Sequence, residues 1–183
     1  MGRLGFAAAI GLVALALGAV ADAAKKGGAQ VVKDPTDRGG KFYDPEIYAS
    51  CDIKKVEATV KGASLFVTVS TRGKQEFPKS NLNLNTRGSK RSAAEYQARP
   101  YGGLAVIKGN KFDEAGAKTK QMNGGKALRF EIALKRIGGP KKTGFQAQTC
   151  GEGAVDIAPG GNYFDDTSFD GTVAPKYKSI KTG

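Results

Sequence analysis

The chain of 183 residues contains no histidine and no tryptophan. The absence of imidazole excludes Ser-His-Asp and Cys-His nucleophilic sites, as well as zinc sites that depend on histidine. Met122 is the only methionine after Met1, so a haem held by histidine or methionine on both faces is excluded too. The commonest routes to hydrolytic, zinc-dependent and haem chemistry are therefore closed to this sequence.

Cysteine is also scarce: the chain has two, Cys51 and Cys150, and no Cys-x-x-Cys pair. In an oxidising compartment an even pair forms a disulfide, whereas the missing Cys-x-x-Cys argues against a redox-active site. The bond would close a loop of about 100 residues and stabilise the fold by about 4–5 kcal/mol in the chain-entropy account. It would join strands that are either adjacent in one sheet or facing across two.

The first 23 residues have the features of a secretory signal peptide. Arg3 gives a positive start, residues 4–20 are small and apolar, and Ala21-Asp22-Ala23 has the small-x-small form that signal peptidase cleaves. We therefore expect residues 1–23 to be removed, residues 24–30 to form a flexible leader, and the mature protein to be secreted or periplasmic. A retained N-terminal anchor is the alternative, and no transmembrane segment is expected in the mature chain.

Positive charge is in excess, with 29 Lys and Arg against 17 Asp and Glu, a net charge of +12. Removal of residues 1–23 takes away one Arg and one Asp and leaves this balance unchanged. Such a chain is attracted to anionic surfaces. Outside the cytoplasm we expect a glycan or an anionic envelope polymer as the partner, and not nucleic acid. The alternative is that the charge, which is spread along the chain, only confers solubility.

Alternation of apolar and polar residues is typical of β-strands, and no long 3.6-residue period follows residue 23. The clearest hairpin turns at Gly62-Ala63, with a bulge between Ile53 and Val56. We expect an all-β fold, a single two-sheet antiparallel β-sandwich of the immunoglobulin or jelly-roll kind, over residues 31–165. Residues 114–126 are polar and glycine-rich, and residues 166–183 are expected to form a basic C-terminal tail. Strands are expected around residues 31–32, 51–61, 65–69, 81–85, 95–99, 104–108, 128–134 and 145–150.

Two acidic turns have the spacing of ligands for a hard cation. From Asp166 the sequence reads Asp-x-Ser-x-Asp-Gly, so Asp166, Ser168 and Asp170 resemble the opening of a calcium loop. The twelfth position is a tyrosine instead of the closing Glu, so the segment is not an EF-hand. Asp34 and Asp37 form a second acidic turn whose carboxylates could share a cation. The alternative for both segments is a surface turn in which the Asp side chains cap local amides.

Aromatic side chains lie in expected loops or at expected strand ends, together with basic ones. Tyrosine can stack on a sugar ring, and arginine can hold an anion. We therefore predict a ligand-binding surface formed by Tyr43, Tyr48, Tyr96, Tyr101 and Arg99. The alternative is that most of the aromatic side chains cover the ends of the sandwich core.

Four features follow one another along the chain in an order that resembles a known family. They are an Asp-Pro-x-Asp turn at residues 34–37, an Asp-Ile strand start at Asp52, a strand and loop over residues 128–140, and an Asp-x-x-Pro-x-Gly-x-Tyr element at residues 156–163. This order resembles the secreted bacterial DOMON-like, or family 9 carbohydrate-binding-module-like, β-sandwiches over most of residues 30–165. The resemblance implies a binding role and a structural calcium held by Asp34, Asp37 and Asp52, with Asp156 behind them.

The sequence also departs from both functional branches of that family. The sugar-binding branch has a slot lined by tryptophan, and the haem-binding branch uses methionine and histidine ligands, but this chain has neither tryptophan nor histidine. The resemblance therefore supports the fold more than a function.

Together these features predict an exported, non-catalytic binding module for a glycan or another anionic cell-surface ligand. No cofactor is required, although the acidic turns could hold a structural calcium. A structural or accessory protein that interacts with another exported protein is the alternative. A hydrolase that uses two carboxylates is less favoured. Nothing in the sequence marks a catalytic pair among Glu46, Asp52, Glu57, Glu131 and Asp156.

Overall fold

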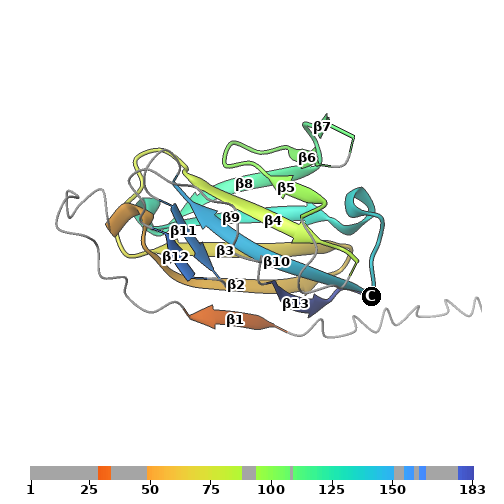
Figure 1. Cartoon of the computed structure of the whole chain (residues 1–183), viewed down its shortest axis with the longest axis horizontal. Helices are drawn as coiled ribbons and strands as arrows, with labels where there is room; N and C mark the ends of the chain where they lie inside the picture. Colours follow the sequence, from red (N-terminus) through yellow and green to blue (C-terminus); the bar gives the residue numbers. More distant parts are fainter. Residues whose placement is uncertain are drawn as a thin grey trace, which may run out of the picture.

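The computed structural model describes residues 29–33, 49–87, 94–107, 109–150, 155–158, 161–163 and 177–183. The described chain is mostly β-structure, arranged as two open antiparallel sheets that pack face to face as in a β-sandwich (Figure 1). This confirms the prediction of an all-β, two-sheet fold, whereas the predicted signal peptide lies outside the described residues. No helix in the described segments is long and apolar enough to cross a membrane.

The first sheet has the strand order β1-β2-β3-β9-β8. The strands are β1 (Gln30–Lys33), β2 (Ile53–Lys61), β3 (Ser64–Thr71), β8 (Ala117–Met122) and β9 (Ala127–Ala133). β2 and β3 form the predicted hairpin, and their register shifts between Ile53 and Lys55, where the sequence predicts a bulge. Because of this shift, Ile53 and Val56 are both buried although they lie three residues apart.

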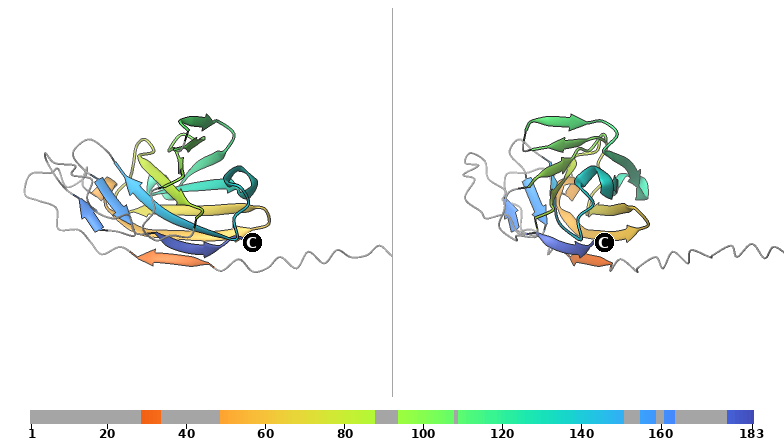
Figure 2. Two further views of the ribbon diagram at one scale, coloured as in Figure 1. Left: turned by 45° about the vertical axis from the view of Figure 1, so that its right-hand side comes forward. Right: turned by 90° about the vertical axis from the view of Figure 1, so that its right-hand side faces the viewer.

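The second sheet follows the order β12-β11-β10-β4-β5-β6-β7, and β13 pairs with β10. Its strands are β4 (Ser80–Asn85), β5 (Tyr96–Ala98), β6 (Leu104–Val106), β7 (Lys111–Asp113), β10 (Lys142–Thr149), β11 (Val155–Ala158), β12 (Gly161–Tyr163) and β13 (Lys178–Lys181). β13 and β11 share one edge of β10, because β13 pairs with residues 142–145 and β11 with residues 147–149. β1 and β13 lie side by side at one edge of the sandwich, and β6 and β7 lie at the opposite edge (Figures 1 and 2).

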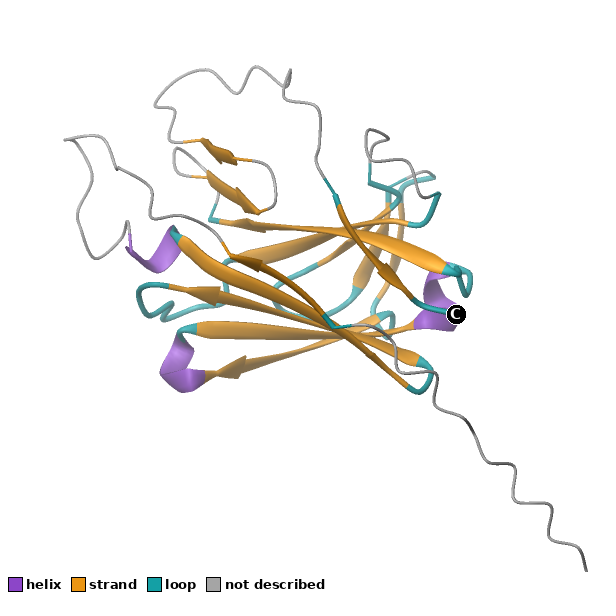
Figure 3. Ribbon diagram, turned by 90° about the horizontal axis from the view of Figure 1, so that it is seen from below, coloured by secondary structure: helices purple, strands orange, loops and turns teal. Residues whose placement is uncertain are grey.

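The core lies between the sheets and is built from the inward alternate residues of their strands. Full burial of one large apolar side chain contributes roughly 1.5–3 kcal/mol. The largest fully buried side chains are Phe130, Phe145, Ile53, Leu65, Leu82, Leu84, Leu104, Leu128, Ile132, Ile137, Ile180 and Val56. Short helical turns, η1 (Asn123–Gly125) and η2 (Leu134–Ile137), follow β8 and β9 (Figure 3). η2 covers one end of the core because Leu134 and Ile137 are buried.

Several strands lie where the sequence predicts none. β8 falls in the polar, glycine-rich stretch, and as an edge strand it buries only Ala117. β13 falls in the stretch expected to be a basic tail, yet it pairs with β10 and buries Ile180. β11 and β12 pair with each other beyond β10. The second sheet therefore extends past residue 165, because short edge strands need little apolar sequence to form.

Candidate ligand-binding faces

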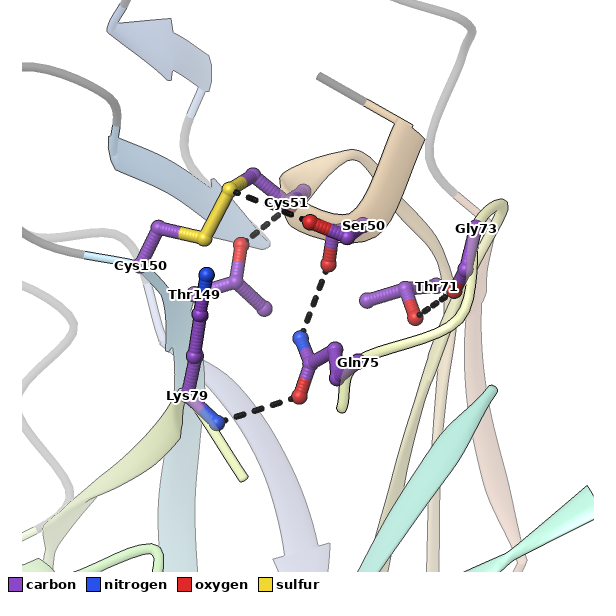
Figure 4. The surroundings of a disulfide bond; sticks show 8 residues. All are labelled: Ser50, Cys51, Thr71, Gly73, Gln75, Lys79, Thr149 and Cys150. Carbon is purple, nitrogen blue, oxygen red and sulfur yellow. Dashed lines mark hydrogen bonds between the residues drawn. A yellow bond between two sulfur atoms is a disulfide. The ribbon is translucent and has the colours of Figure 1, made fainter. Parts of the chain in front are cut away.

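The predicted disulfide between Cys51 and Cys150 is present and joins the two sheets at one end of the sandwich (Figure 4). Cys51 stands just before β2 of the first sheet, and Cys150 follows β10 of the second. The bond therefore crosses between sheets instead of linking neighbours within one. The Thr149 hydroxyl donates a hydrogen bond to the carbonyl of Cys51 and adds a second link at the same place.

The connection between β3 and β4 packs against this disulfide. The Gln75 Nε2 amide donates to the Ser50 carbonyl at 2.9 Å, and its Oε1 accepts from the Lys79 backbone N–H at 3.1 Å (Figure 4). The Lys79 carbonyl in turn accepts from the backbone N–H of Cys150 at 2.9 Å. The polar groups around the disulfide thus form hydrogen bonds with one another, and we call this end of the molecule, where the two sheets are joined, the structural junction.

Asp52, one of the predicted calcium ligands, lies beside this junction and forms an ion pair. Its side chain is only 1% exposed, and its Oδ2 accepts a hydrogen bond from the Arg72 Nε at 2.8 Å. Its Oδ1 is buried without a hydrogen-bond partner. Burial raises the pKa of Asp52, and the charge and hydrogen bond of Arg72 offset this only in part. A guanidinium therefore occupies one oxygen that the calcium prediction assigned to a metal.

Of the other predicted calcium ligands, only the backbone of Asp156 belongs to the described residues. Asp34 and Asp37 lie outside the described residues, as do Asp166, Ser168 and Asp170 of the second acidic loop. The backbone of Asp156 pairs with Thr149 next to the disulfide. Among the described residues there is no group of three or more His, Cys, Asp or Glu that could hold a metal. A structural calcium therefore stays a prediction.

The predicted aromatic and basic ligand-binding residues fall in different environments. Tyr101 is 74% exposed in the turn between β5 and β6. Arg99 is exposed in the same turn, and its carbonyl accepts from the N–H of Gly102 at 3.1 Å. Tyr96 instead lies half-buried against the core, as in the alternative reading of the aromatic residues. Tyr43 and Tyr48 lie outside the described residues.

The outward side of the first sheet carries an excess of basic side chains, and we call it the cationic face. Val56, Ala58 and Val67 point into the core, so the residues that alternate with them point outward. The register places six basic residues and two acidic ones on this side: Lys33, Lys55, Lys61, Lys118, Lys120, Arg129, Glu57 and Glu131.

Two contacts order the middle of the cationic face, while its rim is open to solvent. The Lys55 Nζ lies 3.0 Å from Glu57 Oε2. The Arg129 guanidinium lies over the Phe66 ring, 4.5 Å from its centroid. Lys118 and Lys120, on the edge strand β8, are exposed. The face therefore combines two side-chain contacts near its centre with exposed ammonium groups that can reach an anionic ligand.

The outward side of the second sheet has different chemistry, and we call it the amide face. Where the central strand β4 pairs with β10 on one side and β5 on the other, the outward residues are Gly144 and six amides: Asn81, Asn83, Asn85, Gln97, Gln146 and Gln148. Gln97 Nε2 donates to Asn83 Oδ1 at 3.0 Å, and Asn83 Nδ2 donates to Gln146 Oε1 at 3.5 Å. None of these positions is charged, although the chain as a whole carries a net charge of +12.

The amide face is also more closely packed than the cationic face. Asn85 is 1% exposed and Gln146 6%. Tyr177 packs next to Gly144, and a Cβ at that glycine would lie 3.0 Å from the Cβ of Tyr177. Burial raises the pKa of the Tyr177 hydroxyl. The outward residues Asn83 and Gln97, which lie opposite each other, begin a row that runs across the sheet. Ala105 of β6 pairs with Gln97, and Phe112 of β7 pairs with Ala105.

Neither face is identified as a site by the sequence analysis. The cationic face depends on β8, whose lysines stand in a segment without a predicted strand. The amide face has a local signal, because asparagine alternates with leucine at residues 81–85 and glutamine flanks alanine at residues 146–148. That signal indicates a half-buried strand, but only the register between β4 and β10 shows that the amides lie side by side.

Comparison with known proteins gives no family for this chain. No protein-family model matches it, and no curated protein matches it.

Proposed function

We propose that this protein is an exported, non-catalytic binding module that holds an acidic glycan or similar anionic envelope polymer on its cationic face. The observation that carries the proposal is the gathering of six basic and two acidic side chains on one sheet surface. Clustered like charges on one surface create a potential that concentrates ligands of opposite charge. The net charge of +12 acts in the same direction at longer range.

The geometry of the cationic face suits an extended ligand. Neighbouring strands are about 4.8 Å apart, so the five strands from β1 to β8 span about 19 Å. Lys33 and Lys55 lie opposite each other at one side of the sheet, while Lys120 lies opposite Arg129 at the other. A flexible polyanion that lies across the strands can therefore meet cations at both sides.

The described carboxylates support a binding role over a hydrolytic one. Four of them lie in ion pairs, and a paired carboxylate is poorly suited to act as a free acid or nucleophile. The pairs are Asp52 with Arg72, Glu57 with Lys55, Glu95 with Arg87, and Asp113 with Arg136.

The proposal is tested with polygalacturonate as the acidic probe and dextran as the neutral control, over salt from about 20 mM to about 500 mM. Binding to polygalacturonate is expected at low salt and should fade as the Debye length shrinks. Replacing Lys55, Lys118 and Lys120 by Gln should weaken low-salt binding by about 100-fold. A cation near an anionic surface contributes about 1 kcal/mol, and about 1.4 kcal/mol is a tenfold change.

A matched variant controls for net charge. Replacing Lys111, Lys141 and Lys142 by Gln removes the same charge from exposed positions outside the cationic face. It should weaken binding far less than the cationic-face variant. Equal losses in both variants would show that net charge alone drives binding, and an absence of binding at low salt would remove the proposal.

A second candidate function, an accessory protein that docks on another exported protein, is favoured by one observation. β7 is the last strand at its end of the second sheet, and the nearby Ile107 and Phe112 are 50% and 56% exposed. An unpaired edge with exposed apolar side chains can accept a strand from a partner. A photocrosslinking residue at position 112 tests this in intact cells. Formation of one discrete adduct with another exported protein would favour it over polymer binding.

A further inference from the structure

Where β4 pairs with β5 and β10, the amide face carries hydrogen-bonding groups but no charge, and the nearest outward charges along β10 are the paired Lys142 and Lys181. A carboxamide offers both donors and acceptors, as a sugar hydroxyl does, whereas an ammonium only donates and a carboxylate only accepts. In a chain with a net charge of +12, a row of uncharged amides is matched to an uncharged ligand that can both donate and accept. Neutral polysaccharides have this chemistry, and the row offers no cation to pair with the charges of a polyanion.

Hydrogen-bonding capacity is left over on the amide face. Gln97 uses one N–H for Asn83, and Asn83 uses one N–H for Gln146. A carboxamide can make about four hydrogen bonds, so half-buried Gln97 and Asn83 retain donors and acceptors. In the same sheet Asn81 Oδ1 is buried and has no hydrogen-bond partner. Such a group lacks the partner that buried polar atoms normally find.

An aromatic ring lies at the end of the same row. Phe112 is 56% exposed and is two strands away from Gln97, a distance of about 10 Å. The backbone of Gly103 has a φ of 80° and leaves room for the ring, because a Cβ there would overlap it. The ring is therefore seated on the sheet with exposed surface, which suits stacking on the apolar face of a sugar.

We infer that the amide face binds an uncharged polysaccharide chain, with Asn83 and Gln97 bonded to sugar hydroxyls and Phe112 stacked on a sugar ring. This site is separate from the cationic face and does not depend on polyanion binding there. A protein partner is less well matched, because the exposed large apolar side chains on this row and its flank are only Tyr101, Ile107 and Phe112 among the described residues.

The test uses three neutral hexasaccharides as probes: β-1,4-linked glucose, β-1,3-linked glucose and β-1,4-linked N-acetylglucosamine. Titrations of the full protein are followed by amide NMR shifts at about 0.5 M salt, where charge attraction is screened. At least one hexasaccharide should bind and shift the signals of β4, β5 and β7. Phe112→Ala and Gln97→Ala should each weaken that binding by about tenfold.

Matched variants make the outcome decisive. Phe77 is 64% exposed and lies on the loop between β3 and β4, so Phe77→Ala should leave binding unchanged. The cationic-face variant should also bind the hexasaccharide normally, which separates this inference from polyanion binding. Equal losses in Phe77→Ala and Phe112→Ala, shifts confined to the cationic face, or no binding of any hexasaccharide would each overturn the inference. So would a Phe112→Ala defect limited to capture of a protein partner.

Discussion

The two outer faces of this sandwich are built on the same kind of antiparallel sheet but differ in charge and packing. The cationic face carries charged side chains at eight outward positions, and Lys118 and Lys120 extend into solvent. The amide face is uncharged where β4, β5 and β10 pair, and Gln146 is nearly buried. The centre of one face therefore attracts anions by its charge, whereas the centre of the other offers only uncharged hydrogen-bonding groups.

The largest effect should come from the element that holds both faces together. The disulfide joins the sheets across a sequence separation of 99 residues, so replacing Cys51 and Cys150 by Ser should lower the unfolding free energy by about 4–5 kcal/mol. Urea denaturation with and without reductant measures this. Both faces should lose stability together, and a loss below about 1 kcal/mol would mean that the sheets are held mainly by their core.

Because the two faces differ in packing, substitutions on them should change the stability of the protein by different amounts. A Cβ at position 144 would press on Tyr177, so Gly144→Ala should destabilise the protein by about 1–3 kcal/mol. Lys120→Ala, at an exposed position of the cationic face, should change stability by less than about 0.5 kcal/mol. Thermal unfolding of the two variants compares them directly. Similar effects of both substitutions would contradict the contrast between a packed and an open face.

Two carboxylates, one beside each sheet, should give opposite pH dependences. Burial raises the pKa of Asp52 above its ordinary value of 3.8, so the stability that it contributes is present below pH 3.8 and is lost as the pH rises through the raised value. Burial also opposes ionisation of Glu95. There, however, hydrogen bonds from Thr86 and the charge of Arg87 outweigh burial and lower the pKa below 4.5. Its contribution is present above pH 4.5 and is lost as the pH falls.

Urea unfolding between about pH 3 and pH 6 checks these signs against the ordinary carboxyl values. Relative to Asp52→Asn, the wild-type protein should lose stability as the pH rises. Relative to Glu95→Gln, it should gain stability. Differences of the same sign for both pairs would show that the environments of the two carboxylates are assigned incorrectly.

A small effect is expected from the cation–π contact of the cationic face. Arg129→Gln removes the guanidinium that lies over Phe66 at 4.5 Å. Both side chains are half-buried at the surface, and a contact of this kind is worth about 0.5–1 kcal/mol. Stability should fall by that amount, and binding of an acidic polymer should weaken with it. Binding that is unchanged while stability falls would restrict Arg129 to a structural role.

Local sequence patterns predict the parts of the fold that depend on neighbours in the chain. The β2–β3 hairpin follows from alternation on both sides of Gly62, and the bulge follows from the spacing of Ile53 and Val56. The disulfide follows from having two cysteines. β8 and β13 could not be predicted, because an edge strand is stabilised by its partner and has little apolar pattern of its own.

For a related reason, neither face could be predicted from the sequence alone. Asn83 and Gln146 are 63 residues apart, and Lys33 and Lys55 come from strands whose pairing is not local. Side chains become neighbours on a face only through register, and a shift of one residue would place them on the opposite side. Arg99 and Tyr101 share one turn because they are only two residues apart, and their role in ligand binding stays a prediction.

Amide NMR mapping of polygalacturonate binding at low salt tests the central contrast most directly, because it reports both faces of one protein in one experiment. The account predicts that signals of outward residues on β2, β3, β8 and β9 shift, that those of Asn83, Gln97 and Phe112 do not, and that the shifts vanish at about 0.5 M salt. Shifts centred on the amide face, or shifts that persist at high salt, would contradict it.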